Sequence, residues 1–168
     1  PYDVLLFGSR AYVSNWGGRQ PQAGDLTGPA GRGTVVRVDP VRQIASEGSV
    51  SVVDVESGKV VSEIQTGLHS SGLAHSQAHS FVVCCNAASD NLSIIDTRTN
   101  AVAATIWAKP NAADLLGAAP NAAAFDATGR RLYVANGSQN ALAVFKFDPA
   151  EPKQSRLLGM IPVSWYPG

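Results

Sequence analysis

Three histidines are the residues best suited to metal binding or proton transfer in this sequence: His69, His75 and His79. His75 and His79 are four positions apart, a spacing that would place both rings on one face of an α-helix and allow a zinc site. The repeats described below predict a strand and a turn at these positions instead, so the two rings should diverge. We therefore expect no metal site, and we expect His69 to be either an ordinary loop residue or part of a contact surface.

The other reactive residue types form no catalytic constellation. The sequence contains no G-x-S-x-G, G-x-x-x-x-G-K-[ST] or H-E-x-x-H motif. Asp54 and Asp96 end matched strands of different repeats, so they should cap turns rather than form an acid–base pair. Cys84 and Cys85 are adjacent, and with no second pair they cannot complete a zinc site. We expect them to be strand residues on opposite faces, with a vicinal disulfide or a redox role as the alternative, and we predict no catalytic residue and no cofactor.

Composition excludes several classes of partner. The chain has 13 Lys and Arg residues against 13 Asp and Glu residues, and it lacks the basic run of a nucleic-acid-binding protein. No stretch approaches 18 consecutive apolar residues, so no membrane span is expected. The apolar fraction of 45% is too high for a disordered chain. The sequence begins at Pro1 and shows no charged-then-apolar leader, so these features do not indicate a compartment.

Internal repeats predict the elements that position these residues. Each repeat contains an apolar run that ends in Asn, as expected of a buried strand followed by an Asx-type turn; the three runs are Ala11–Asn15, Val82–Asn86 and Leu132–Asn136. A run of alternating or β-branched residues follows each one, at Ser49–Asp54, Asn91–Asp96 and Asn140–Phe145. After a polar turn comes a third strand, at Val60–Gln65, Ala101–Trp107 and Leu157–Val163. A short strand opens each unit, at Val4–Phe7, Gly72–His75 and Ala122–Phe125.

These strands divide the chain into three units, at residues 1–69, 70–119 and 120–166. The first unit holds an insertion at about residues 17–48, which includes a short apolar stretch, Thr34–Pro40, that could form a strand or a hairpin. Four short strands every 40 to 50 residues is the spacing of a β-propeller blade. The sequence therefore predicts an all-β protein, a β-propeller fragment of about three four-stranded antiparallel blades, with almost no helix outside the long loops.

Two of the repeats carry a recognisable motif. Tyr12-Val13-Ser14-Asn15 and Tyr133-Val134-Ala135-Asn136 resemble the YVTN β-propeller repeat of bacterial and archaeal surface-layer and secreted proteins, and Val83-Cys84-Cys85-Asn86 is a degenerate copy. The stretches YVSNWGGR, AAPNAAAFD and IPVSWYP resemble the subgroup whose propeller precedes an alkaline-phosphatase-like phosphoesterase domain. The resemblance implies a periplasmic, cell-surface or secreted protein. The partners it implies are the remaining propeller blades and an adjoining phosphoesterase domain.

Candidate contact residues should gather at one end of the blades. Connections between antiparallel strands alternate between the two ends of a sheet, which places the insertion at the same end as the crossovers between blades. We call this end the crossover face. The contact residues predicted there are Trp16, Arg19, His69, Trp107, Lys109, Trp165 and Tyr166. Arg19 and Lys109 could meet a small anionic ligand, and the aromatic side chains would supply apolar area around it. The alternative is that the insertion and the aromatic residues only pack locally.

The function predicted from these features is that of a non-catalytic binding or scaffolding module of a larger secreted protein. One alternative is the propeller part of a phosphoesterase whose catalytic domain lies outside this chain. Another is a lactonase-like propeller enzyme with a site in its channel, although no cluster of acidic residues and histidines favours it. Three blades would leave apolar faces uncovered at both ends, so we also expect the chain to self-associate.

Overall fold

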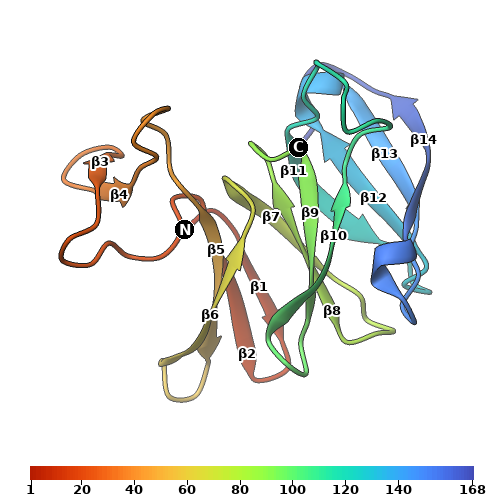
Figure 1. Ribbon diagram of the computed structural model, residues 1–168. Helices are drawn as coiled ribbons and strands as arrows, with labels where there is room; N and C mark the ends of the chain where they lie inside the picture. The colour runs from red at the N-terminus through yellow and green to blue at the C-terminus, as the bar shows by residue number, and fades with distance from the viewer.

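The computed structural model describes all 168 residues as three antiparallel four-stranded sheets that stand side by side (Figure 1). Blade one contains β1 (Val4–Phe7), β2 (Arg10–Asn15), β5 (Gly48–Asp54) and β6 (Val60–Thr66). Blade two contains β7 (Ser70–His75), β8 (Phe81–Asn86), β9 (Asn91–Asp96) and β10 (Ala101–Trp107). Blade three contains β11 (Pro120–Phe125), β12 (Arg131–Asn136), β13 (Ala141–Lys146) and β14 (Arg156–Pro162). The expected all-β architecture is confirmed.

Helical structure is confined to two 3₁₀ turns, η1 (Gly137–Gln139) and η2 (Pro152–Gln154), each within a hairpin of blade three. None of the helical segments has the length and apolar character needed to cross a membrane.

Packing between the blades explains the apolar runs of the sequence. All six residues of β8 are buried, because blade two is covered on both faces. The core between blades one and two includes Tyr12, Val52, Val82 and Ile95. A larger core of 14 buried residues joins blades two and three. A strand between two such cores can be apolar at successive positions, as in the continuous run of β8.

The two cysteines lie in different cores, as expected for adjacent strand residues. Cys84 belongs to the core between blades one and two, and Cys85 to the core between blades two and three. Both are free and buried. Burial raises the pKa of Cys84 to about 12, so its thiol stays protonated and is a poor nucleophile at neutral pH. This geometry suits packing rather than redox chemistry.

The opening strands of the blades lie side by side along the inner edge of the structure. Ser71 Oγ in β7 donates to the carbonyl oxygen of Pro120 in β11 at 3.1 Å. The backbone amide of Leu73 donates to Asp3 Oδ2, next to β1, at 2.8 Å. Gly72 allows the close approach of β7 and β11, since a Cβ atom there would collide with Asn121 O and lie 2.8 Å from the Cα of Ala122. These contacts hold the opening strands of neighbouring blades together.

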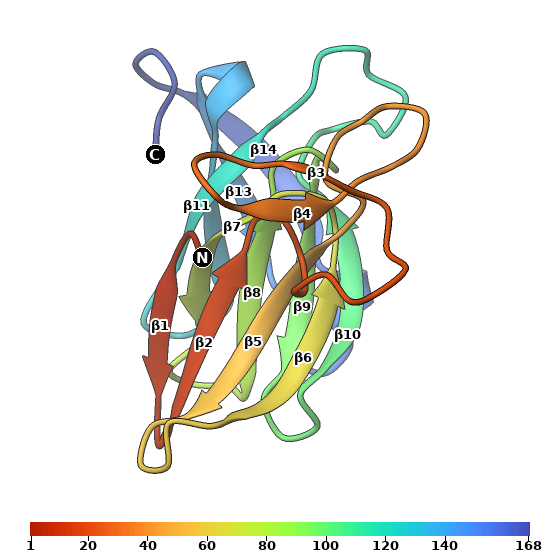
Figure 2. The same ribbon diagram turned by 90° about the vertical axis from the view of Figure 1, so that its left-hand side faces the viewer.

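The insertion lies at the crossover end of blade one, as strand alternation predicts (Figure 2). It folds into a small antiparallel hairpin of β3 (Thr27–Pro29) and β4 (Val35–Arg37), which confirms the expected strand near Thr34–Pro40. Trp16, which directly precedes the insertion, packs on His69 in the crossover from β6 to β7, with ring centroids 4.0 Å apart and ring planes inclined by 32°. The insertion and the crossover therefore share one face.

Two local features recur at equivalent positions. The residue before each new unit has a left-handed backbone, with φ of 54° at His69, 46° at Ala119 and 45° at Tyr166. The Asn residues that end β8 and β12 are buried, but their side-chain amides do not form the expected Asx turns. Asn86 Nδ2 donates to Ser93 Oγ at 2.9 Å, and Asn136 Nδ2 donates to the crossover carbonyl of Ala108 at 2.7 Å. The amides therefore join separate segments of the chain.

Candidate functional site

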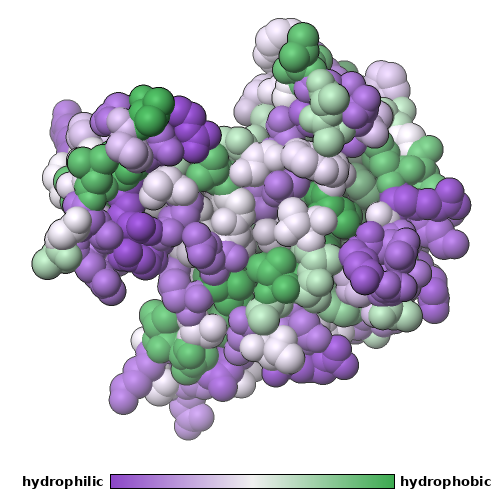
Figure 3. Space-filling view, in the orientation of Figure 1, coloured by the Kyte–Doolittle hydropathy of each residue, from purple (hydrophilic) through white to green (hydrophobic).

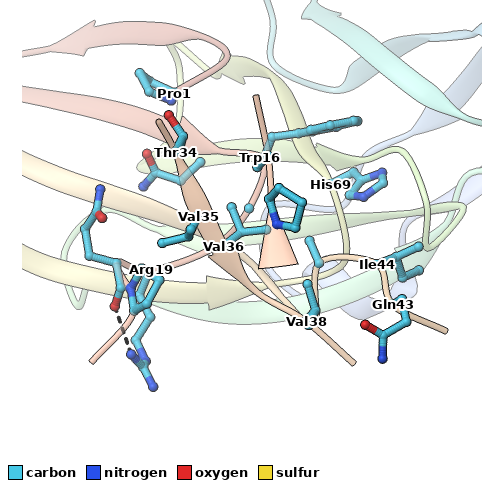
Figure 4. Close-up of a pocket in the computed structure, with 18 residues that line it drawn as sticks. Pro1, Trp16, Arg19, Thr34, Val35, Val36, Val38, Gln43, Ile44 and His69 are labelled. Carbon is cyan, nitrogen blue, oxygen red and sulfur yellow. Dashed lines mark hydrogen bonds between the residues drawn. The ribbon is translucent and has the colours of Figure 1, made fainter. Parts of the chain in front are cut away.

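A cavity of about 530 Å³ lies between the insertion and the crossover from β6 to β7 (Figure 4). Figure 3 shows the insertion as a lobe that stands apart from the three blades. Trp16 and His69 form the aromatic part of the cavity wall, and the insertion supplies an aliphatic part. The aliphatic lining residues include Pro29, Val35, Val36, Val38 and Ile44.

The backbone at Trp16 and the backbone at His69 both help to position this pair of rings. Trp16 follows the last residue of β2, and half of its surface remains exposed. His69 has a left-handed backbone, and its carbonyl oxygen accepts a hydrogen bond from the amide of Ala87 at 3.0 Å. Burial lowers the pKa of His69 below its ordinary value, so the imidazole is neutral at pH 7. The cavity therefore has an uncharged aromatic wall.

Arg19 lines the same cavity, but its charge is already balanced. Its guanidinium lies 2.9 Å from Asp25 and 3.8 Å from Glu47, and Arg37 contacts the same two carboxylates. The hydrogen bond from Arg19, followed by one from the backbone amide of Gln22, lowers the pKa of Asp25 to about 2. Two cations and two anions thus form a neutral network that ties the insertion together.

Trp107 and Lys109 lie in a second place, at the start of the crossover from β10 to β11. Lys109 Nζ is 3.3 Å from Asp90 Oδ2, donates to the carbonyl oxygen of Asp114 at 2.9 Å, and stands 5.8 Å from the centre of the Trp107 ring. Only 7% of Lys109 is exposed. Asp90 also accepts the amide of Ala118 at 2.7 Å. The ammonium group is therefore committed to holding this crossover.

Trp165 and Tyr166 occupy a third place, beyond β14. Trp165 is 84% exposed. The Tyr166 ring covers Gly137, where a Cβ atom would lie 2.7 Å from Tyr166 Cζ, and the Tyr166 amide donates to Asn140 Oδ1 at 2.9 Å. The seven predicted residues thus share an end of the blades but not a single site, and only Trp16, Arg19 and His69 line one cavity.

The sequence did not reveal two parts of the site. The sequence predicted a strand at β4, which supplies part of the aliphatic wall. Its apolar run is short, so the alternation of side chains along it did not indicate which of them would face the cavity. The carboxylates of Asp25 and Glu47 gave no signal, because their pairing with Arg19 depends on the path of an irregular loop. The turn-capping roles were predictable: Asp54 Oδ1 accepts the amide of Ser57 at 2.9 Å, and Asp96 Oδ1 accepts that of Arg98 at 2.9 Å.

No group of three or more His, Cys, Asp or Glu side chains is arranged to hold a metal ion. The arrangement of the cavity offers stacking and apolar contact. It presents no paired nucleophile and base.

Comparisons with known proteins identify the fold. No protein-family model and no curated protein matches the sequence. Hydrazine synthase from Kuenenia stuttgartiensis is a similar structure, with 23% identity, a TM-score of 0.57, and coverage of 73% of this chain and 34% of that one. Dihydro-heme d1 dehydrogenase NirN in complex with DHE has 20% identity, a TM-score of 0.55, and coverage of 73% and 25%. The Cps50 (Swd1) β-propeller domain from Myceliophteria thermophila has 12% identity, a TM-score of 0.52, and coverage of 68% and 32%.

These identities are low, so the similarities concern the fold alone. They support a β-propeller fragment, as the blade architecture does. The chain spans about a third or less of the length of each of these structures.

Proposed function

We propose that this chain is a β-propeller segment that acts as a non-catalytic binding or scaffolding module, with the cavity beside the insertion as its binding site. The observation that carries the proposal is the half-exposed Trp16 ring, stacked on His69 and facing aliphatic side chains across a cavity of about 530 Å³. An exposed aromatic wall of this kind suits ligand recognition, because ligand pockets are mostly apolar with a few polar groups that orient the ligand.

The charges around the cavity favour a neutral ligand with a flat ring. An anion could reach Arg19 only in competition with Asp25 and Glu47, which already contact it. A neutral ring does not have to compete with these carboxylates and can stack on the indole of Trp16. The polar side chains of Thr34 and Gln43 also line the cavity and could bind a substituent of that ring. This proposal replaces the anionic ligand that the sequence suggested for Arg19.

Trp107, Lys109, Trp165 and Tyr166 remain candidates for contact with an adjoining domain. Trp107 and Trp165 both expose half or more of their surface on the crossover face, which is a common property of aromatic residues at interfaces. In this proposal Lys109 and Tyr166 position the crossovers that carry these two side chains.

The sequence resemblance supports a finer proposal, that the chain is part of a YVTN-type propeller in a secreted or cell-surface protein. Its partners would then be the remaining blades of that propeller. The alternative is the propeller of a phosphoesterase, supported only by the three resembling stretches of sequence. The gene sequence downstream of Gly168 separates the two: further repeats alone favour the scaffold, and an α/β domain rich in metal ligands favours the phosphoesterase.

The binding proposal can be tested with a neutral probe and an anionic probe of the same shape. Benzamide and benzoate serve here, with binding measured by saturation-transfer NMR. We expect benzamide to bind more tightly than benzoate, and Trp16→Ala to weaken benzamide binding at least fivefold. Trp107→Ala is the matched control, because it removes an equally exposed tryptophan outside the cavity, and it should leave binding unchanged. Benzamide binding that survives Trp16→Ala, or tighter binding of benzoate, would refute the proposal.

A further inference from the structure

The turn that contributes Gln43 and Ile44 to the cavity lining is fixed by its own hydrogen bonds. The amide of Gln43 donates to the carbonyl oxygen of Asp39 at 2.9 Å, and the amide of Asp39 donates to that of Ile44 at 2.9 Å. Asp39 Oδ1 also accepts the amides of Val41 and Arg42, at 3.0 and 2.7 Å. The turn therefore presents its side chains from a well-defined backbone.

Gln43 has a backbone conformation that is unfavourable for a residue with a side chain. Its φ is 56°, in the left-handed region, and it lies in the insertion, where no repeated position of the blades accounts for it. Glycine is the usual residue where a helical turn ends in this conformation, because a Cβ atom makes the conformation less stable. Backbone strain of this kind gathers at ligand-binding sites, so it points to a role for the side chain.

One hydrogen bond fixes the orientation of the Gln43 carboxamide. Gln43 Nε2 donates to the carbonyl oxygen of Pro40 at 2.9 Å, and the reverse orientation would set two oxygen atoms against each other. The carboxamide oxygen, Oε1, accepts no hydrogen bond from the rest of the chain. In Figure 4 this oxygen lies on the side toward Val38, another residue of the cavity lining. The turn therefore offers a hydrogen-bond acceptor to the cavity.

The remaining polar groups of the lining do not reverse this preference. The N–H groups of Arg19 already contact two carboxylates and the carbonyl oxygen of Gln20. Asn15 uses its side-chain nitrogen for hydrogen bonds to two serine hydroxyls, at 3.2 and 2.7 Å. The hydroxyl of Thr34 and the neutral imidazole of His69 each offer both a donor and an acceptor. A ligand group that supplies an N–H donor is therefore favoured.

We propose that Gln43 determines the specificity of the cavity, and that its carboxamide oxygen selects neutral aromatic ligands that carry an N–H donor, such as aromatic amides. This rests on the proposed function, because it needs a ring stacked on Trp16. A ring of the same shape without an N–H group gains the same stacking, but it leaves the Gln43 oxygen facing a group that cannot donate. The donor, rather than the shape of the ring, then decides which ligand binds more tightly.

Benzamide and acetophenone test this selection, because they share a shape and a carbonyl oxygen and differ by an NH2 group in place of a methyl group. Their binding to the 168-residue chain is measured by saturation-transfer NMR titration. We expect the wild-type chain to bind benzamide at least threefold more tightly than acetophenone. Gln43→Met keeps the length of the side chain without its amide, and it should bind the two probes equally. Gln77→Met, in the exposed turn between β7 and β8, is the control and should keep the wild-type preference.

Gln43→Gly separates a binding role from a structural one. Glycine adopts the left-handed conformation without strain. The variant should therefore unfold at no lower urea concentration than the wild-type chain, while its preference for benzamide is lost. A lower urea midpoint together with a retained preference would show that the side chain serves the turn, and it would overturn the proposal.

The outcomes also separate the role of Gln43 from the proposed function. Equal binding of the two probes by the wild-type chain, weakened for both by Trp16→Ala, would overturn the role of Gln43 and leave the binding site in place. A preference that survives Gln43→Met would also overturn that role. Binding that Trp16→Ala does not weaken, or no binding of either probe, would overturn both proposals.

Discussion

Trp16 and His69 are far apart in the sequence, but the β2–β5 and β6–β7 connections that carry them lie at the same end of blade one. Their ring centroids are therefore only 4.0 Å apart. At the residue scale this pair gives the cavity both its aromatic surface and its lack of charge. A protonated imidazole would need solvation that the partly covered position does not supply. The burial of the His69 ring thus determines both the packing of the aromatic wall and its lack of charge.

The pKa of His69 is the first prediction at this scale. We expect its imidazole to titrate below the ordinary value of about 6.5, because burial disfavours the charged form. The unfolded chain then binds more protons than the folded chain as pH falls past that value. The stability contributed by His69 is therefore fully present above about pH 6.5 and decreases as pH falls through the folded pKa. Histidine ring NMR signals followed against pH measure this pKa directly.

Trp16→Ala is the matched control for this titration. Removing the indole admits water to the ring of His69, so the pKa should return toward its ordinary value. An unchanged pKa in Trp16→Ala would show that something other than the stacked indole buries His69.

At the scale of elements, the blades depend on the close approach of their opening strands. Gly72 lies in β7, where the register to β8 shifts between Ser70 and Leu73 and the backbone comes against β11. A side chain at this position must displace the backbone of Asn121 and Ala122. The glycine is required here by space, since its φ is not in the left-handed region.

Gly72→Ala should therefore destabilise the fold by about 1–3 kcal/mol, the usual cost of overpacking a tight contact. Urea unfolding followed by circular dichroism gives the free energy of unfolding. Gly159→Ala in β14 is the control, because nothing lies within 4 Å of the added Cβ atom, and it should leave the stability nearly unchanged. Equal effects of the two substitutions would contradict the close packing of β7 against β11.

The sequence predicted the strands well because their signals are local. Apolar runs closed by Asn gave β2, β8 and β12 to within one residue at their starts, and the repeat gave their partners. The irregular parts were not predictable in the same way. β7 begins at Ser70 rather than Gly72, because Ser70 pairs with Asn86 of β8 and the register between the two strands shifts between Ser70 and Leu73. An irregular pairing of this kind does not appear in the periodicity of a single strand.

The sequence predicted at which end of the blades the candidate site lies, but not which residues form it. Strand alternation placed the insertion and the crossovers on one face, and the stacking of Trp16 on His69 agrees with this. Which of those residues meet was not predictable, because it depends on loop conformation. Lys109 forms an ion pair with Asp90, and Arg19 forms ion pairs with two carboxylates of the insertion.

At the scale of the whole molecule, the three blades form a packed body, and the insertion that lines the proposed binding site lies outside its cores. Two buried cores join the blades, and neither includes any residue of the β3–β4 hairpin. In blades two and three the equivalent connection is short, at Ala87–Asp90 and Gly137–Asn140. A blade therefore closes without an insertion, and the long connection of blade one is not needed to form its sheet.

Deleting Gln20–Glu47 and joining the ends with a short glycine-containing turn tests this separation most directly. The variant should keep the circular dichroism spectrum and the cooperative urea unfolding of the wild-type chain, because both inter-blade cores remain. Its binding of benzamide should fall at least tenfold, because the aliphatic wall opposite Trp16 is gone. Intact folding with unchanged benzamide binding would contradict the assignment of the site, and loss of the fold would contradict the separation of scaffold from site.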